Sequence, residues 1–288
     1  MLPIFSYINN FPHPDDGSLF HFTSADSFFK IIENLNFKVS PFKNLNDLNE
    51  GNVHNMVLAN NFDVMNKAHK YIQDRCYTLC FSQNYFIGNY CEQGSNHPAM
   101  WAHYANNSSG VCIVIDRERF IKKNNDILKD YFYKFEKVDY KWRNTPNNSC
   151  IKYNVKNEFE FIKSNYKHLF FTKNTDWEHE DEYRLFIMGW DENIKLDIDG
   201  CIKYIVLGNK FFRDELQIKK LLDKIVTPES SCYKKFIPHS FATSSYYRCG
   251  YYTFEISYKI FDIINSNIKD QRYFNYKKWL IEECGYDE

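Results

Sequence analysis

The stretch GVCIVID, residues 110–116, decides the fold class of this 288-residue chain. It is a continuous apolar run, rich in β-branched residues, that begins at a glycine and ends at a charged stretch. Such a run is typical of a strand buried in a sheet. Further runs of strand-forming residues lie before it, at 18–24 and 76–82, and after it, at 183–190 and 201–208. We therefore expect a sheet whose strands are spread over the first 210 residues.

Helical periodicity fills the stretches between these strands. Ser24 ends the first strand and is placed to cap a helix in which Phe28, Ile32 and Leu35 recur at helical spacing. Pro98 can open a short helix, because its fixed φ suits the first turn. Longer helices are expected at 52–74, 117–129, 154–171 and 213–226. The pattern predicts an α+β fold with flanking helices.

The domain organisation follows from length and regularity. The chain carries no internal repeat and no low-complexity linker. Its length is within the range of one large α+β domain. We assign residues 1–226 to one domain, and the less regular residues 227–288 to a C-terminal extension packed on it.

Composition excludes several classes of protein. Hydrophobic residues make up 44% and charged residues 25%, which is ordinary for a globular core and not for a disordered chain. The 36 Lys and Arg nearly balance the 37 Asp and Glu, so no overall positive field attracts nucleic acid or an anionic membrane. The nine cysteines form no CxxC pair, and no segment resembles a signal peptide or a membrane span. We expect a cytoplasmic protein with no membrane partner.

The stretch TDWEHEDEYRLF, residues 175–186, concentrates acids just before an apolar run. If the segment is extended, Glu178, Glu180 and Glu182 project to one face, because strand side chains alternate. Arg184 falls on the same face and can pair with one carboxylate. Two interpretations stay open: a solvated sheet edge with a local ion pair, or a paired-carboxylate site.

Two further groups carry possible chemistry. His21 lies in an aromatic strand with Thr23 on its face, although a histidine there is more often a satisfied core residue. Trp101 and Tyr104 share one face of a short helix and are placed to form a flat stacking wall, although aromatics on such helices are usually core residues.

Several segments, taken in order, resemble a family known as the bacterial domain of unknown function 2971. They are LFHFTSADSFFKIIENLNFKVSPFKNLNDLNEG, LCFS, AMWAHYANNSSGVCIVID and WEHEDEYRLF, within residues 18–208. The Trp-His-Tyr segment followed by glycine and a strand is the most specific part. One departure is Leu48 after Asp47, where the family usually has proline. This family assignment implies no activity.

A looser resemblance is to the ADP-ribosyltransferase fold of the His-Tyr-Glu type. A first strand with His21 and Thr23, followed by a helix and NFKVS, is similar to the start of that fold. The pair Glu180-x-Glu182 is similar to the Glu-x-Glu motif on one of its late strands. The resemblance implies a mixed, split β-sandwich with NAD in a cleft.

The same resemblance implies a role for each matching residue. His21 would hydrogen-bond the NAD ribose with support from Thr23, and Ser82 matches a serine that steadies the cleft in other branches. Glu182 would hold the nicotinamide-ribose hydroxyl, and Glu180 would orient the acceptor. The implied catalytic residues are Glu182, Glu180 and His21, and the implied NAD-binding residues are His21, Thr23, Ser82, Trp101, Tyr104 and Arg184, with Trp101 or Tyr104 stacked on nicotinamide.

The implied function is an NAD-consuming ADP-ribosyltransferase or NAD glycohydrolase. Cleavage of the bond to nicotinamide develops positive charge on the ribose, which a fixed carboxylate stabilises. NAD is then a substrate, and the acceptor is protein, nucleic acid, a small molecule or water. The resemblance also implies a bacterial toxin or antiviral defence setting, with a cognate inhibitor or antitoxin as partner.

Two other functions stay open. One is a non-catalytic sensor module of the same fold that binds a nucleotide or a partner. The other is a metal-dependent hydrolase using His21, His103 and the glutamates. No HExxH or comparable ligand spacing supports a metal, so we assign no metal ligands.

Overall fold

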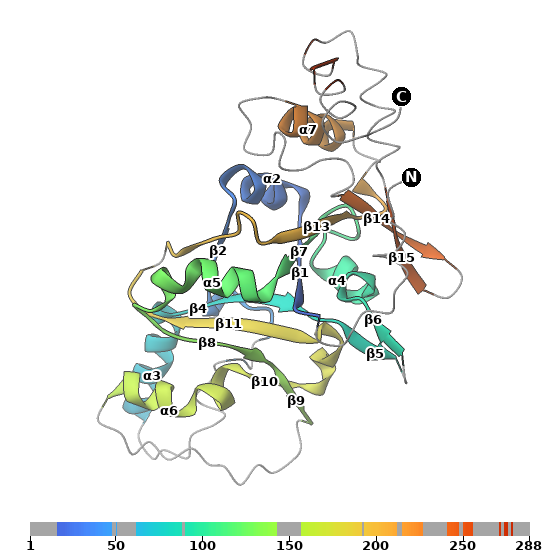
Figure 1. The fold of residues 1–288 in the computed structure, drawn as a ribbon. Helices are drawn as coiled ribbons and strands as arrows, with labels where there is room; N and C mark the ends of the chain where they lie inside the picture. Colours follow the sequence, from blue (N-terminus) through green and yellow to red (C-terminus); the bar gives the residue numbers. More distant parts are fainter. Residues whose placement is uncertain are drawn as a thin grey trace. The chain divides into compact units, whose positions relative to one another are not determined.

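The computed structural model describes residues 16–47, 50, 62–87, 90–142, 157–191, 193–211, 215–226, 241–247, 250–255, 271, 274, 275 and 278 (Figure 1). The chain divides into two compact units, each assembled from separate stretches of sequence. Unit 1 comprises Met1–Asn36, Gln83–Phe120 and Ile198–Glu288, and unit 2 comprises Phe37–Ser82 and Ile121–Asp197.

The sheet of unit 1 is built around the apolar run that opened the sequence analysis. Its strands, in the order β15-β14-β13-β7-β1, are β15 (Gly250–Glu255), β14 (Phe241–Tyr247), β13 (Ile202–Leu207), β7 (Val111–Asp116) and β1 (Ser18–Thr23). β7 pairs antiparallel with β1 on one side and with β13 on the other. Val111 to Ile115 are fully buried, which explains why this strand reads as a continuous apolar run.

Short helices complete unit 1. α2 (Ala25–Asn34) begins where Ser24 accepts a hydrogen bond from the Ser27 backbone N–H, as the sequence predicted. Pro98 opens α4 (Pro98–His103), and α7 (Glu215–Val226) follows β13. The remaining elements are β5 (Tyr85–Ile87), β6 (Tyr90–Glu92) and the 3₁₀ helix η3 (Gly94–Asn96).

A left-handed turn links α4 to β7. Asn106, Asn107 and Ser108 have φ values of 46°, 53° and 66°, a conformation that costs most L-residues energy. The turn lies directly against the residues that follow β13: the Gly208 N–H donates to the Gly110 carbonyl at 2.9 Å. A side chain at Gly208 would overlap the Ser108 carbonyl group, so this close backbone approach requires glycine.

The sheet of unit 2 has the order β4-β11-β8, with β3 (Ser40–Pro41) beside β4. β4 is Cys76–Ser82, β11 is Glu182–Met188 and β8 is Phe132–Lys137. β11 is antiparallel to both of its neighbours. It is therefore an inner strand of this sheet, and the interpretation of the acidic stretch as a solvated sheet edge is wrong.

Two helices cover one face of this sheet. α3 (Phe62–Arg75) and α6 (Glu158–Phe170) contact each other beneath β4, β11 and β8 (Figure 1). The core here is aromatic: the rings of Phe170 and Phe186 stack with centroids 4.0 Å apart, and Phe42 meets Phe170 edge-on.

Shorter elements surround this core. The elements are α5 (Arg117–Leu128), β9 (Asp139–Lys141), β10 (Thr172–Asn174), β12 (Lys195–Asp197), β2 (Asn36–Lys38) and the 3₁₀ helices η1 (Phe42–Asn44) and η4 (Thr175–Glu180). β9 and β10 pair in parallel. None of the helices in the described part of the chain is long and apolar enough to cross a membrane.

The acidic stretch is not one extended segment, contrary to the sequence-based expectation. Residues from Thr175 to Glu180 form η4, Asp181 takes a left-handed conformation with φ of 43°, and only then does β11 begin. Glu178 is exposed, whereas Glu180 and Glu182 are buried. Aspartate tolerates a positive φ better than most residues, which makes the abrupt change of direction at Asp181 inexpensive.

The predicted α+β class is confirmed, with mostly antiparallel pairing. The expected strands and helices are found within a few residues, although 52–61 of the first long helix lie outside the described residues. The boundary at residue 226 stays a prediction. β14 and β15, from the expected C-terminal extension, continue the sheet of unit 1 because β14 pairs in parallel with β13.

Candidate functional site

Two cross-strand pairs in unit 2 define the candidate site. Glu182, the first residue of β11, is the register partner of Ser82, the last residue of β4. Tyr140 on β9 is the register partner of Lys173 on β10. Partners of this kind place their side chains on the same face.

The backbone of Glu182 joins these pairs. Its N–H donates to the Tyr140 hydroxyl oxygen at 2.9 Å, and its carbonyl accepts from the Val138 N–H at 3.0 Å. The N–H and C=O of a strand residue point to the same side, so Glu182 forms a non-hydrogen-bonded pair with Ser82 across β4. In such pairs the two side chains lie closest together.

Lys173 is held between three carboxylates. Its Nζ lies 2.6 Å from Glu180 Oε2, 2.7 Å from Glu182 Oε2 and 3.2 Å from Glu50 Oε1. The Trp177 ring lies 5.5 Å from the same Nζ. One ammonium group therefore gathers glutamates from three separate segments.

Arg184 closes the cluster from the sheet side. Its Nε binds Glu182 Oε1, and its NH2 group lies 2.8 Å from Glu182 Oε2 and 2.9 Å from Glu50 Oε1. Its NH1 donates to the Phe170 carbonyl at 2.7 Å. The predicted pairing of Arg184 with a carboxylate on its own face is confirmed.

All five charged side chains of the cluster are buried, with exposed fractions from 0% for Arg184 to 8% for Lys173. Burial alone raises the pKa of Glu182, but Arg184 and Lys173 outweigh it and hold that pKa well below the ordinary range. Burial raises the pKa of Glu50, although both cations oppose the shift. Burial opposes the charge of Lys173, yet Glu182 and Glu50 raise its pKa. Glu182 is thus ionised at neutral pH.

Two polar atoms beside the cluster find no hydrogen-bond partner among the residues that the structure describes. They are the Oγ of the completely buried Ser82 and the Nδ2 of Asn174. The Oδ1 of Asn174 caps η4 by accepting a hydrogen bond from the Asp176 N–H, so only the Nδ2 of the same amide lacks a partner within the described ranges. A buried polar group without a partner costs free energy, and a bound water or ion commonly satisfies it.

The residues predicted from the sequence fall into two sets. Ser82, Glu180, Glu182 and Arg184 meet in unit 2, as described above. The others belong to unit 1: these are His21, Thr23, Trp101 and Tyr104. The expected convergence of the two sets stays a prediction.

Within unit 1, these residues differ in how accessible they are. His21 is half-buried in the middle of β1, and Thr23 is buried at its end. Trp101 is completely buried: its Nε1 donates to the Ser95 carbonyl at 2.7 Å, and Phe22 packs edge-on against its ring. Trp101 therefore offers no open face to nicotinamide, and only the half-buried Tyr104 retains the proposed stacking role.

Sequence reasoning missed three members of the site: Lys173, Tyr140 and Glu50. Glu50 ends the NDLNE segment that carried the family resemblance, and this was a signal for its importance. Lys173 and Tyr140 carried no local signal, because both join the site through strand pairing across more than 30 positions of sequence.

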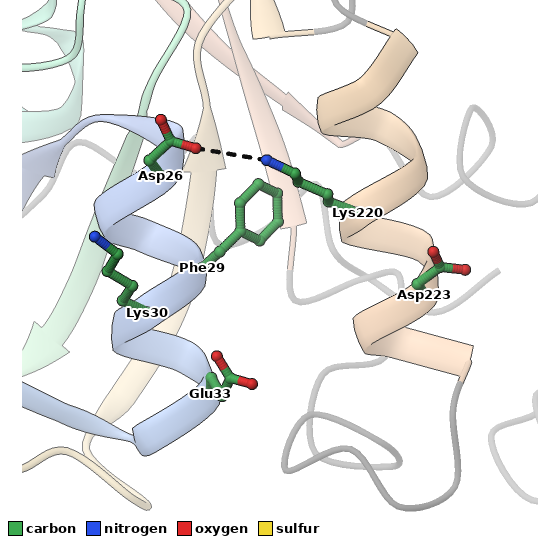
Figure 2. Close-up of a pocket in the computed structure, with 6 residues that line it drawn as sticks. All are labelled: Asp26, Phe29, Lys30, Glu33, Lys220 and Asp223. Carbon is green, nitrogen blue, oxygen red and sulfur yellow. Dashed lines mark ion pairs between the residues drawn. The ribbon is translucent and has the colours of Figure 1, made fainter.

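A separate cavity of about 570 Å³ lies on the surface of unit 1, between α2 and α7 (Figure 2). Lys220 on α7 reaches across it to Asp26 on α2 at 3.6 Å, above the ring of Phe29. Lys30, Glu33 and Asp223 complete a charged lining. Its side chains are mostly solvated, and none of the residues expected to act in function lines it.

No group of three or more His, Cys, Asp or Glu side chains in the described ranges is arranged to hold a metal ion. Comparisons with curated proteins and with solved structures find no match. The sequence model of one family does match: residues 100–185, from α4 to the middle of β11, fit the family described as protein of unknown function (DUF2971), which supports the family resemblance seen in the sequence.

Proposed function

We propose that the protein is an NAD-consuming ADP-ribosyltransferase or NAD glycohydrolase, with the acidic centre of its active site at Glu182 and Ser82. One observation carries this proposal: the Ser82 hydroxyl is completely buried, belongs to the register partner of Glu182 on the adjacent strand, and has no partner in the described part of the chain. A hydroxyl of a bound ribose would satisfy it. The resemblance assigned Glu182 to the nicotinamide-ribose hydroxyl and matched Ser82 to a serine that steadies the cleft.

The topology of each unit supports the same proposal. Unit 1 contributes the order β13-β7-β1 with His21 on β1, and unit 2 contributes β4-β11-β8 with Ser82 and Glu182 on the first two of these strands. The chain therefore builds two groups of strands in alternation. Each group carries part of the expected residue set.

The electrostatics suit a cationic transition state. Loss of nicotinamide develops positive charge on the ribose, and a fixed ionised carboxylate nearby typically lowers such a barrier by ~3–4 kcal/mol. Glu182 is held ionised, and Glu180 binds the same ammonium group of Lys173. In the proposed reaction Glu182 stabilises the ribosyl cation and Glu180 orients the acceptor.

Direct contact between Glu182 and ribose also requires a rearrangement. Both carboxylate oxygens are bound by Arg184 or Lys173. Lys173, the most exposed member of the cluster, would have to withdraw from Glu182 as the ligand enters. His21 and Thr23 keep their implied role at the ribose, and Tyr104 keeps the stacking role. The toxin or antiviral setting rests on the resemblance alone.

A second function, a non-catalytic recognition module, is favoured by one specific observation. The ion pairs of Glu182 are complete without a ligand, as expected for a cluster that stabilises a fold rather than a reaction. The two functions differ in turnover. The module binds a nucleotide or partner and leaves NAD intact.

The test measures NAD loss and nicotinamide release, with mass spectrometry of cell lysate to find ribosyl adducts. Ser82→Ala removes a hydroxyl that has no partner, so it should leave the melting temperature unchanged or slightly higher while turnover falls at least tenfold. Thr78→Val is the matched control on the same strand, because the Thr78 hydroxyl donates to the Leu185 carbonyl at 3.1 Å. We expect it to lower stability and to spare turnover.

The outcomes separate the two functions. Binding of NAD without nicotinamide release by the wild type would replace the enzyme with the recognition module. Absence of both binding and release would remove NAD from either function.

A further inference from the structure

Tyr140 is linked to two charged residues of the proposed site, Lys173 and Glu182. It is the register partner of Lys173 on one side, and its hydroxyl oxygen accepts the Glu182 backbone N–H on the other. A tyrosine hydroxyl can accept and donate at once. The acceptor role is filled, but the hydroxyl hydrogen has no acceptor among the described residues.

The surroundings keep this group a neutral donor. Burial raises the pKa of Tyr140, and the charge of Glu182 raises it further. The hydroxyl therefore keeps its hydrogen at any physiological pH. Ser82, on the opposite side of Glu182, adds a second neutral hydroxyl that can donate or accept.

We propose that Tyr140 and Ser82 form a two-hydroxyl subsite that flanks Glu182 and holds a neutral sugar hydroxyl pair, the diol of the nicotinamide ribose. This inference rests on the proposed function and adds a binding residue to it. Adjacent ribose hydroxyls offer both donors and acceptors, so one can accept from Tyr140 while its neighbour bonds Ser82. An anionic group such as a phosphate fits less well, because the ionised Glu182 lies beside both Tyr140 and Ser82.

A purely structural role for Tyr140 predicts a different result. If its hydroxyl serves only to accept the Glu182 N–H, Tyr140→Phe costs one hydrogen bond of stability and leaves ligand affinity unchanged. Affinity for a ribose-containing ligand therefore separates the two roles, and stability alone does not.

The experiment is calorimetric titration of the full chain with NAD, ADP-ribose and nicotinamide. NAD and ADP-ribose both carry the ribose in question, whereas nicotinamide lacks it. We expect Tyr140→Phe and Ser82→Ala each to weaken the binding of NAD and of ADP-ribose by a similar factor of about 5–10, which corresponds to the loss of one hydrogen bond. Nicotinamide alone should not bind measurably.

Tyr166→Phe is the matched control. Tyr166 is another half-buried tyrosine of unit 2, and its hydroxyl donates to Glu136 Oε1 at 3.0 Å rather than to a member of the cluster. We expect wild-type affinities for both ligands. Thermal melts of every variant identify any loss of affinity that reflects unfolding, and Ser82→Ala keeps the subsite testable if Tyr140→Phe does not fold.

The results that would overturn the subsite differ from those that would overturn the function. If Ser82→Ala weakens binding but a folded Tyr140→Phe does not, Tyr140 is structural and the proposed function stands. If Tyr140→Phe weakens the binding of NAD but not that of ADP-ribose, the tyrosine contacts nicotinamide and the ribose assignment is wrong. If the wild type binds neither NAD nor ADP-ribose, subsite and function fail together.

Discussion

At the scale of single residues, Glu182 and Glu50 show how one buried cluster holds carboxylates of opposite character. The ion pairs of Glu182 outweigh its burial and lower its pKa, whereas burial outweighs the ion pairs of Glu50 and raises its pKa. The two groups share Arg184 and Lys173 as partners. Each carboxylate receives three contacts from these cations, but those of Glu182 are at most 2.8 Å long, whereas those of Glu50 are 2.9–3.2 Å long.

This difference predicts opposite pH dependences. The stability that Glu182 contributes is present above its ordinary pKa of 4.5 and is lost as the pH falls toward its lowered folded value. The destabilisation by Glu182→Gln should therefore be largest at pH 7 and should shrink by on the order of 2–3 kcal/mol toward pH 3. Urea unfolding across this range measures it.

Glu50→Gln is the matched comparison. The contribution of Glu50 is fully present below pH 4.5 and is lost as the pH rises through its raised folded pKa. The stability of Glu50→Gln relative to the wild type should therefore increase with pH, in the opposite direction to Glu182→Gln. Parallel curves for the two variants would show that the cluster does not set these pKa values.

At the scale of elements, apolar runs predicted the strands well because burial on both faces leaves a strong composition signal. β4 and β7 lie where the sequence placed them, and the cap at Ser24 is confirmed. The prediction that the acidic stretch is extended was wrong, because the alternation of side chains does not reveal a turn in the backbone. Its direction changes at the left-handed Asp181, so Glu180 and Glu182 reach Lys173 from two different elements rather than from one strand face.

The candidate site was predicted only in part for a related reason. Glu180, Glu182 and Arg184 lie within five positions, and Ser82 ends a recognisable strand. Lys173 and Tyr140 were missed because a parallel pairing between two three-residue strands leaves almost no sequence pattern. Trp101 is completely buried, and helical spacing shows which aromatics share a face but not whether that face is covered.

The close contact after β13 gives a prediction at the same scale. Gly208→Ala places a methyl group against the backbone of Ser108, 2.7 Å from its carbonyl carbon, and backbone on both sides must shift. We expect a loss of about 1–3 kcal/mol or more in the free energy of unfolding.

Gly200→Ala is the control, because a side chain there meets nothing within 4 Å and only the positive φ of 75° opposes it. Its cost should be about 1–2 kcal/mol. Denaturant titration compares the two, and a smaller loss for Gly208→Ala than for Gly200→Ala would contradict the role given to this contact.

At the scale of the whole molecule, each unit has its own group of strands and its own core, and the charge cluster belongs wholly to unit 2. Lys173→Met removes the cation that joins three glutamates, and breaking a buried ion pair in this way typically costs about 3–5 kcal/mol. Amide hydrogen exchange should therefore accelerate in β4 and β11 more than in β1 and β7.

Lys163→Met is the control for this prediction, because Lys163 is exposed and only lies over aromatic rings. It should leave exchange nearly unchanged. Equal acceleration in both units by Lys173→Met would show that they open as one cooperative structure.

The interleaving of the two units also sets an order of assembly during synthesis. Unit 2 has its whole sequence once residue 197 has left the ribosome, whereas β7 of unit 1 still lacks β13, which ends at residue 207. Multidomain chains commonly fold from the N-terminus as each unit emerges. Here the unit that contains β1 is the last to be completed, so the apolar β7 must wait for one of its two neighbours while about 90 further residues are translated. A nascent chain halted near residue 197 should consequently expose β7 to chaperones, although the sequence of unit 2 is already complete.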